Sequence, residues 1–327
     1  MTDSTLAERA RDGDRRALAR LLTEVENRTA AGEQALKTLY PLAGRAHLVG
    51  VTGAPGSGKS TMVAALTGEA RKQNRPVAVI AIDPSSPITG GAILGDRVRM
   101  QIHATDDDVF IRSMASRGHS GGLAASTVAA AAVMDAAGFG LIFIETVGTG
   151  QSEVEIAAIA DTTVVVQSPE MGDEVQAIKA GLLEVADIVV VNKADRPGAD
   201  RAAAQLRAML TVGASTDKAA VAAGRPRPKR PEVMLGSALS GKGVPELLAA
   251  LDRRAPAPGA RPADDASLKR AEAQISGILA QRVNARLHDP ARAAARAETL
   301  KAVAAHEIDP FTAADRLLAL LGTDSAG

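Results

Sequence analysis

The sequence predicts an α/β fold, with a mainly parallel sheet, helices on both of its faces and helical extensions at both ends of the chain. From His47 onward, short apolar runs alternate with longer Ala-rich segments. Apolar strands separated by helical crossovers are typical of a parallel sheet that is covered on both faces. In addition, polar motifs directly follow most of these runs, at the strand ends where such sheets bind ligands. The expected strands are His47–Thr52, Val77–Asp83, Val109–Met114, Leu141–Thr146, Thr163–Gln167, Asp187–Asn192 and Val233–Ser237.

Residues 1–45 are expected to form an N-terminal helical extension. Leu6–Val25 is rich in Ala, Leu and Arg, and its apolar residues recur at helical intervals at Leu18, Leu21, Leu22 and Val25. This spacing predicts one amphipathic helix. Gln34–Leu42 continues the pattern until Pro41 interrupts it.

Residues 46–254 are expected to form the main domain. Its crossover helices are predicted at Lys59–Gln73, Leu123–Ala137 and Asp173–Val185. Residues 255–327 then begin with a Pro- and Ala-rich linker, 255–265, and continue as a helical arm. This arm is too thin to build its own core, so it is expected to pack on the main domain or on a second copy. The arm helices are predicted at Ser267–Arg286, Pro290–Ala305 and Pro310–Leu321.

Composition excludes several classes of partner. The chain of 327 residues carries 38 Lys and Arg against 38 Asp and Glu, so no net charge attracts it to nucleic acid or to a membrane surface. It has four Phe, one Tyr and no Trp, which leaves no obvious platform for stacking bases. Cysteine is absent, so disulfides and thiolate metal sites are excluded. Neither a signal peptide nor an apolar run of about 18–20 residues is found, and a cytoplasmic protein is expected.

The first motif is a phosphate-binding loop between an expected strand and an expected helix. Glycines let successive backbone N–H groups converge on phosphate oxygens at the positive end of the following helix. Lys59 is expected to reach the β- and γ-phosphates, and the Ser60 hydroxyl to ligate Mg²⁺. The sheet is therefore predicted to be that of a P-loop NTPase. The expected nucleotide contacts here are Gly53, Ala54, Pro55, Gly56, Ser57, Gly58, Lys59, Ser60 and Thr61.

The second motif, Asn192-Lys193-Ala194-Asp195, ends the sixth expected strand and predicts guanine recognition. The Asp195 carboxylate can accept hydrogen bonds from guanine N1–H and the N2 amino group, whereas adenine would leave this acceptor unpaired. Lys193 would lie along the base plane, and Asn192 would tie the loop to the phosphate loop. A third loop, Ser237-Ala238-Leu239, resembles the backbone donors that contact guanine O6 in GTPases. The predicted ligand is GTP or GDP.

Candidate Mg²⁺ ligands follow the other strands. Glu145 ends an apolar strand three residues before Gly148, whose N–H is expected to sense the γ-phosphate. Mg²⁺ is usually held by one or two carboxylates together with phosphate oxygens and water. Asp83 faces the same crevice and is expected to orient the attacking water or a Mg²⁺-bound water, although a simple turn before Pro84 is the alternative. Asp96 lies in a Gly-rich stretch that suits a switch, with a solvated loop acid as the alternative.

Two further candidates for the catalytic apparatus lie after the fifth expected strand. Asp173 either caps the following helix or belongs to a mobile nucleotide sensor. Lys179, in that helix, is a second candidate, with a solvated helix residue as the alternative. The five histidines are scattered and do not show ligand spacing.

The chain resembles the MeaB/ArgK family of methylmalonyl-CoA mutase-associated GTPases, bacterial relatives of the human cobalamin type A protein. The resemblance rests on three segments: Ala81-Ile82-Asp83-Pro84-Ser85-Ser86-Pro87, Arg117-Gly118-His119-Ser120-Gly121-Gly122-Leu123 and Glu145-Thr146-Val147-Gly148. It implies that Asp83, Asp96 and Glu145 surround Mg²⁺, and that Ser168–Lys179 couples the nucleotide to a partner. It also implies a homodimer held by C-terminal arms. The implied partner is adenosylcobalamin-dependent methylmalonyl-CoA mutase, whose cofactor loading and protection GTP hydrolysis would gate.

Three alternatives remain open from the residues. A nickel-inserting metallochaperone GTPase normally needs Cys or His ligands, which this chain does not cluster. An ATP-dependent kinase associated with amino-acid transport conflicts with the guanine-type loop at Asn192–Asp195. A non-catalytic protein that binds nucleotide only as a structural ligand is the third. No Gln directly follows Gly148, so slow intrinsic hydrolysis is expected until a partner completes the site.

Overall fold

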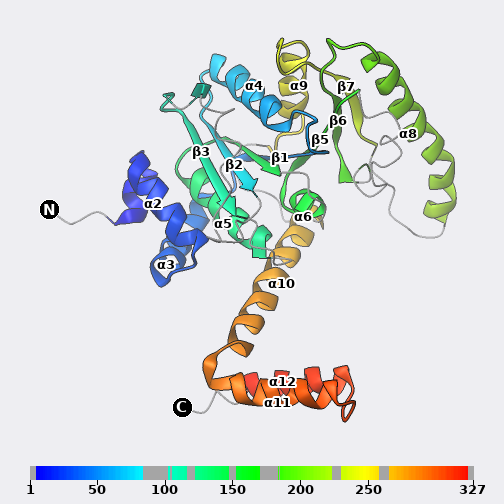
Figure 1. The fold of residues 1–327 in the computed structure, drawn as a ribbon. Coiled ribbons are helices and arrows are strands. Elements are labelled where there is room, and N and C mark those ends of the chain that lie inside the picture. Colours follow the sequence, from blue (N-terminus) through cyan, green and yellow to red (C-terminus); the bar gives the residue numbers. More distant parts are fainter. Residues whose placement is uncertain are drawn as a thin grey trace.

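Seven parallel strands form one sheet in the order β3-β2-β4-β1-β5-β6-β7 (Figure 1). The computed structural model describes residues 5–83, 102–103, 105–115, 122–146, 152–169, 183, 185–222, 230–257 and 265–322. All seven strands were predicted, each within one or two residues of its observed ends. Their bounds are β1 His47–Thr52, β2 Val77–Asp83, β3 Val109–Ala115, β4 Leu141–Thr146, β5 Thr162–Gln167, β6 Ile188–Val191 and β7 Glu232–Leu235.

Helices cover both faces of the sheet, as predicted. α4 (Lys59–Lys72) and α9 (Val244–Asp252) pack on one face, where they share a core with Val164 and Val166 of β5. On the other face lie α5, α6 and α8, and Val165 of β5 packs against α8. This alternation follows from the two-residue period of a strand. The bounds on the second face are α5 Gly122–Ala136, α6 Ser152–Ile159 and α8 Ala199–Ala222.

The N-terminal extension contains two helices where a single helix was predicted over Leu6–Val25. The helical conformation is interrupted at Gly13, which adopts a φ of 93° that glycine tolerates. Asp14 then caps the next helix by accepting hydrogen bonds from the N–H groups of Arg16 and Ala17. The elements are α1 Leu6–Arg11, α2 Arg15–Glu26, α3 Ala30–Leu39 and the short 3₁₀ helix η1 Tyr40–Leu42.

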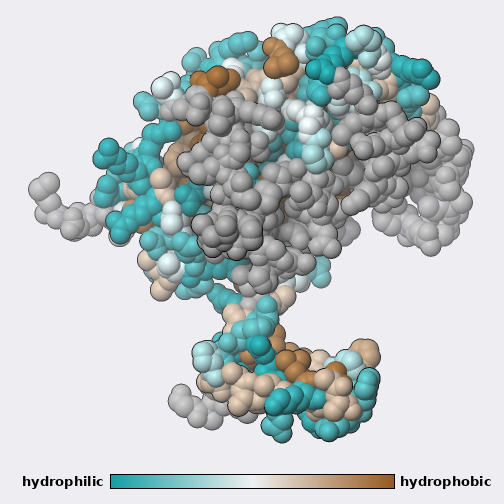
Figure 2. Space-filling view, in the orientation of Figure 1, coloured by the Kyte–Doolittle hydropathy of each residue, from teal (hydrophilic) through white to brown (hydrophobic). Residues whose placement is uncertain are grey.

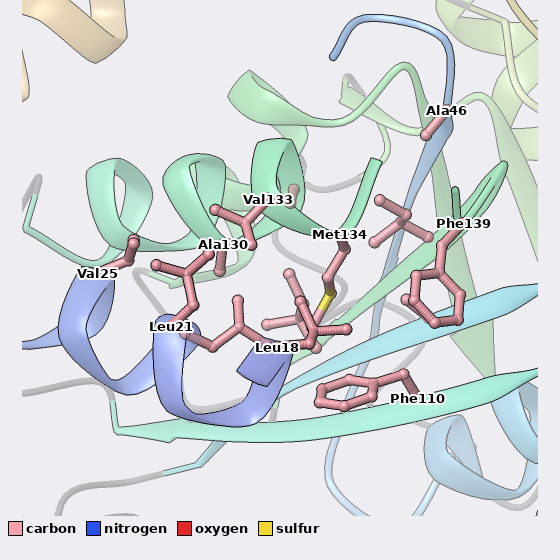
Figure 3. Packing of buried hydrophobic residues seen from close by; sticks show 14 of the residues in the cluster. Leu18, Leu21, Val25, Ala46, Phe110, Ala130, Val133, Met134 and Phe139 are labelled. Carbon is pink, nitrogen blue, oxygen red and sulfur yellow. The ribbon is translucent and has the colours of Figure 1, made fainter. Parts of the chain in front are cut away.

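The extension packs on α5 and on the edge strand β3. Figure 3 shows Leu18, Leu21 and Val25 of α2 pointing toward side chains of α5. A salt bridge of 2.6 Å between Arg112 of β3 and Glu26 of α2 adds a polar link. The extension therefore forms a layer outside α5 rather than a separate body.

The C-terminal arm leads away from the sheet (Figure 1). α10 (Asp265–Leu287) contacts α5 and α6, and α11 and α12 pack on each other near its far end. The helix expected from Pro290 begins instead with a 3₁₀ turn, η4 (Pro290–Arg292), before α11 (Ala293–Ala304) and α12 (Pro310–Gly322). The helix predicted at Asp173–Val185 falls almost entirely outside the described residues.

Candidate functional site

The phosphate loop connects β1 to α4 and closes on itself. The ammonium group of Lys59 donates to the carbonyl oxygens of Gly53 at 2.9 Å and Ala54 at 3.1 Å. The Lys59 side chain is 6% exposed. Pro55 and Gly56 in the same loop are exposed, and Thr61 is half-buried in the first turn of α4. The loop thus encloses the Lys59 ammonium group, which the motif predicts to bind the phosphates.

Two glycines of this loop are required by close approach. Gly53 has a φ of 136°, and a Cβ there would lie 2.1 Å from the carbonyl oxygen of Val166 in β5. Gly58 has a φ of 92°, and a Cβ there would lie 2.3 Å from Nδ2 of Asn192. A side chain at either position would separate the phosphate loop from the strand ends beside it.

An oxygen-rich cluster lies at the start of α4. The Ser60 hydroxyl donates to Oε1 of Glu145 at 2.5 Å, and both side chains are buried. Glu145 is in register with Val51 of β1 and Ala81 of β2. Asp83, two residues beyond Ala81, is the last residue of β2 and is 2% exposed, which places it in the sheet rather than in the turn that follows. Ser60, Glu145 and Asp83 therefore come from adjacent elements at the edge of the sheet that the carboxyl ends of the strands form.

Two threonines outside the predicted motifs support this edge. Thr146 donates to Thr52 at 3.2 Å, and both hydroxyls are buried at the last positions of β4 and β1. The sequence pattern that could have identified this pair is a threonine at the end of each of two apolar strands. This contact joins the strand that carries Glu145 to the strand that leads into the phosphate loop.

Asn192 joins the phosphate loop to the loops after β6 and β7. Its Nδ2 donates to the Ser57 carbonyl at 2.9 Å, and its Oδ1 accepts from the Ala238 N–H at 3.1 Å. The predicted tie between Asn192 and the phosphate loop is therefore present. Ala194 N–H also donates to the Gly236 carbonyl at 3.0 Å. This bond fixes side by side the two loops predicted to bind the base, Asn192–Asp195 and Ser237–Leu239 (hereafter the base loops).

Asp195, which directly follows Ala194, carries a carboxylate at an exposed position. A hydrogen bond from the Ser237 side chain lowers the pKa of Asp195 below its ordinary value. Asp195 is exposed and Ser237 is buried, while the Leu239 side chain is 83% exposed. Lys193 adopts a φ of 57°, a left-handed conformation at the turn between Asn192 and Asp195. An ionised, outward-facing carboxylate is the arrangement that a guanine edge requires.

Four predicted site residues lie outside the described residues: Asp96, Gly148, Asp173 and Lys179. Within the part of the chain that the structure describes, no three His, Cys, Asp or Glu side chains gather as a metal cluster. No helix there is long and apolar enough to cross a membrane.

Comparison with known proteins identifies relatives along nearly the whole chain. A putative GTPase of Pyrococcus abyssi is 46% identical over 318 residues, covering 96% of this chain and 95% of that protein. GTPase ArgK of Escherichia coli is 44% identical over 202 residues, which are 60% of this chain and 61% of ArgK. The methylmalonic aciduria type A homolog of Caenorhabditis elegans is 35% identical over 256 residues, covering 73% of this chain and 62% of the homolog.

A solved structure described as a LAO/AO transport system kinase has the same fold. It superposes with a TM-score of 0.67 at 28% identity, covering 98% of this chain and 99% of that one. A family model described as "Methylmalonyl Co-A mutase-associated GTPase MeaB" matches residues 18–295. Since this match spans most of the chain, the protein belongs to the MeaB family of GTPases.

Proposed function

We propose that this GTPase binds Mg²⁺-GTP across the phosphate loop and the two base loops. The observation that carries the proposal is the pair of hydrogen bonds of Asn192, which hold the Ser57 carbonyl and the Ala238 N–H in one assembly. A nucleotide would then place its phosphates against Lys59 and its guanine edge against Asp195. The loop Ser237–Leu239 would supply backbone N–H groups to guanine O6.

The oxygen cluster at α4 fits Mg²⁺. The Ser60 hydroxyl and the Glu145 carboxylate are hard oxygen donors in direct contact, and Asp83 ends the neighbouring strand. Bound there with phosphate oxygens, Mg²⁺ would neutralise charge on the β- and γ-phosphates. Most GTPases have Asp where this chain has Glu145, and the longer side chain reaches Ser60 directly. Asp96 is proposed as a further metal ligand.

For the reaction, water attacks the γ-phosphate in line with the leaving oxygen. Lys59 and the N–H groups of the phosphate loop stabilise the charge that develops on the phosphate oxygens. We propose that Asp83 orients the attacking water or a Mg²⁺-bound water. We propose that the Gly148 N–H senses the γ-phosphate, and that Asp173 and Lys179 belong to the catalytic apparatus.

We further propose that methylmalonyl-CoA mutase is the partner, and that GTP hydrolysis gates its cofactor loading and protects it. The description of the family and the name of the nematode relative support this role. The test is GTP turnover by the purified protein alone and with saturating mutase, with ATP as the control nucleotide. We expect the mutase to raise GTP turnover at least about tenfold, a modest gain for a completed GTPase site.

The outcomes separate the alternatives. GTP turnover that the mutase does not change would leave the GTPase and remove the proposed partner. Preference for ATP would favour the kinase alternative and overturn the role of Asp195. Absence of any turnover, with tight GTP binding, would favour a structural nucleotide.

We also propose that residues 255–327 act as a dimerisation arm. One side of α10 exposes three large apolar side chains in a single chain: Leu268, Ile275 and Leu279, each between 56% and 58% exposed. Their spacing of four and seven residues puts them on one face of the helix, as in helices that pair. Figure 2 shows hydrophobic side chains gathered on the arm.

A further inference from the structure

A cavity of about 580 Å³ lies where the N-terminal helices, α5 and the arm helix α10 meet. None of the residues assigned above to phosphate, guanine or Mg²⁺ lines it. Small-molecule sites usually measure about 300–1,000 Å³, so the cavity is large enough for an organic ligand. It is therefore a second candidate site, independent of the proposed nucleotide chemistry.

Small residues leave this space open. Ala125 and Ala129 of α5 and Ala285 of α10 line it where larger side chains would fill it. Gly32 of α3 also lines it, and a Cβ there would lie 2.5 Å from the carbonyl oxygen of Glu24. Gly32 thus allows α3 to lie against α2, which sets the wall of the cavity.

The lining is apolar in part and positively charged in part. Val25, Leu36 and Ile278 contribute apolar surface. The charged lining residues are three cations and one carboxylate: Arg28, Lys37, Arg282 and Glu33. Three positive charges against one negative charge leave an excess of two positive charges.

Three of the charged lining residues, Glu33, Lys37 and Arg282, are exposed to solvent. Arg282 of α10 contacts Glu33 of α3 at 3.4 Å, and these side chains remain 66% and 49% exposed. An arginine in this position places its aliphatic stem along apolar surface and its guanidinium near water. The apolar part of a ligand would therefore pack on the apolar lining, and its charged part would lie beside the exposed groups of Arg282 and Lys37.

We propose that this cavity binds a free amphipathic anion, a small molecule with an apolar tail and a carboxylate or phosphate head. The tail would pack on Leu36 and Ile278, and the head would pair with Arg282 and Lys37. Because such a ligand contacts both α3 and α10, its binding favours the arm position seen here over any other.

The test uses the full chain and dodecanoate, titrated by calorimetry below its micelle concentration. We expect one-to-one binding, and binding of dodecyltrimethylammonium that is at least about tenfold weaker because its head carries the opposite charge. Hydrogen exchange of α10 backbone amides is expected to slow when dodecanoate is bound. Equal affinity for the two heads, or no binding of dodecanoate, would overturn the proposal.

Variants locate the binding. Ala285→Leu, on an exposed position of α10, fills the cavity from the arm side and is expected to abolish binding while leaving the thermal midpoint unchanged. Arg282→Ala is expected to weaken dodecanoate binding about tenfold, the effect of one lost charge-assisted hydrogen bond. Arg20→Ala, an exposed arginine of α2 outside the cavity, is the matched control and should bind like the wild type.

Two other occupants would contradict the proposal. If Ala285→Leu changes the oligomer mass by light scattering and the wild type does not bind dodecanoate, the cavity is a contact for a second copy. If the protein ignores free dodecanoate but sediments with phosphatidylglycerol vesicles, and Arg282→Ala prevents this, the exposed charged groups face a membrane instead.

Discussion

The sheet edge that carries the candidate nucleotide site, formed by the carboxyl ends of the strands, and the C-terminal arm are built in opposite ways. At the sheet edge, every residue of β4 and β5 is buried, and Asn192 links the phosphate loop to a base loop by hydrogen bonds within one chain. In α11 and α12, only Thr299 and Ala313 are buried. Large apolar side chains there remain exposed, among them Leu300, Phe311 and Leu318. Contacts within one chain therefore hold the described strand ends together, whereas the arm has apolar surface to bury against something else.

The candidate nucleotide chemistry and the proposed assembly surface therefore belong to separate parts of the chain. Interlocked hydrogen bonds and buried strands position Lys59, Glu145 and Asp195 without help from a second chain. The arm contributes none of the candidate nucleotide contacts. Changes at the sheet edge should therefore alter nucleotide chemistry and spare assembly, and changes on the arm should do the reverse.

The largest effect is expected from Asp195→Asn, which should change base preference from GTP toward XTP. Guanine offers donors to the carboxylate, whereas xanthine replaces the amino group with a carbonyl that accepts from the Asn amide. Sites that hydrogen-bond a substrate group reject the mismatched analogue strongly, so the ratio of GTP to XTP affinity should shift on the order of 10⁴-fold. Competition against a fluorescent GTP analogue measures it, with Asp200→Asn at the exposed start of α8 as the control. An unchanged preference for GTP would remove Asp195 from base recognition.

Lys59→Ala should lower single-turnover GTP hydrolysis by about 10²–10³-fold, because a preorganised charge at the transferring phosphoryl group is lost. Its oligomer mass should stay that of the wild type. Lys72→Ala is the control, since that lysine lies in the same helix with its side chain 74% exposed. A variant at position 59 that keeps a third of the wild-type rate would contradict the assignment.

Glu145→Gln should raise the Mg²⁺ concentration that supports half-maximal GTP turnover, by about 10–100-fold. The amide keeps the size of the side chain near Ser60 and removes the negative charge that attracts the cation. A Mg²⁺ titration of hydrolysis measures the effect, and Glu69→Gln in α4 is the control. If the Mg²⁺ dependence did not move, the carboxylate would not serve the metal.

The smallest effect is expected from Ser237→Ala. The Ser237 hydrogen bond lowers the pKa of Asp195, so its loss should raise that pKa toward the ordinary value. The anion that guanine needs is present above the pKa, so GTP binding should fail at a higher pH in the variant when the solution is acidified. Near neutral pH the loss should stay below about threefold. Binding of a fluorescent GTP analogue, measured across acidic pH, tests this, with Ser240→Ala as the control. If the pH at which binding is lost did not change in Ser237→Ala, Ser237 would have no part in holding the Asp195 anion.

The sequence predicted the sheet closely because buried parallel strands are apolar runs, and each ends at a motif or a turn. It also predicted that Asn192 would reach the phosphate loop, since strand ends meet at one edge. It did not predict the break at Gly13, because the apolar spacing continues across it and only the cap at Asp14 reveals the new helix. The cavity beside α10 was not predictable either, because alanines such as Ala129 and Ala285 suit any helix, and only packing shows the space that they leave.

The most direct test measures nucleotide turnover and oligomer mass together in an arm variant, Ile275→Glu with Leu279→Glu. Both side chains are exposed in one chain, so the charges should not disturb its fold. The control, Ala280→Glu with Asn284→Glu, puts the same charges on exposed positions around the other side of α10. We predict a monomer whose turnover without mutase stays selective for GTP over ATP and within about twofold of the wild type, since surface changes away from a site have small effects. A dimer that persists, turnover that falls with the dimer, or equal turnover of ATP would contradict the account.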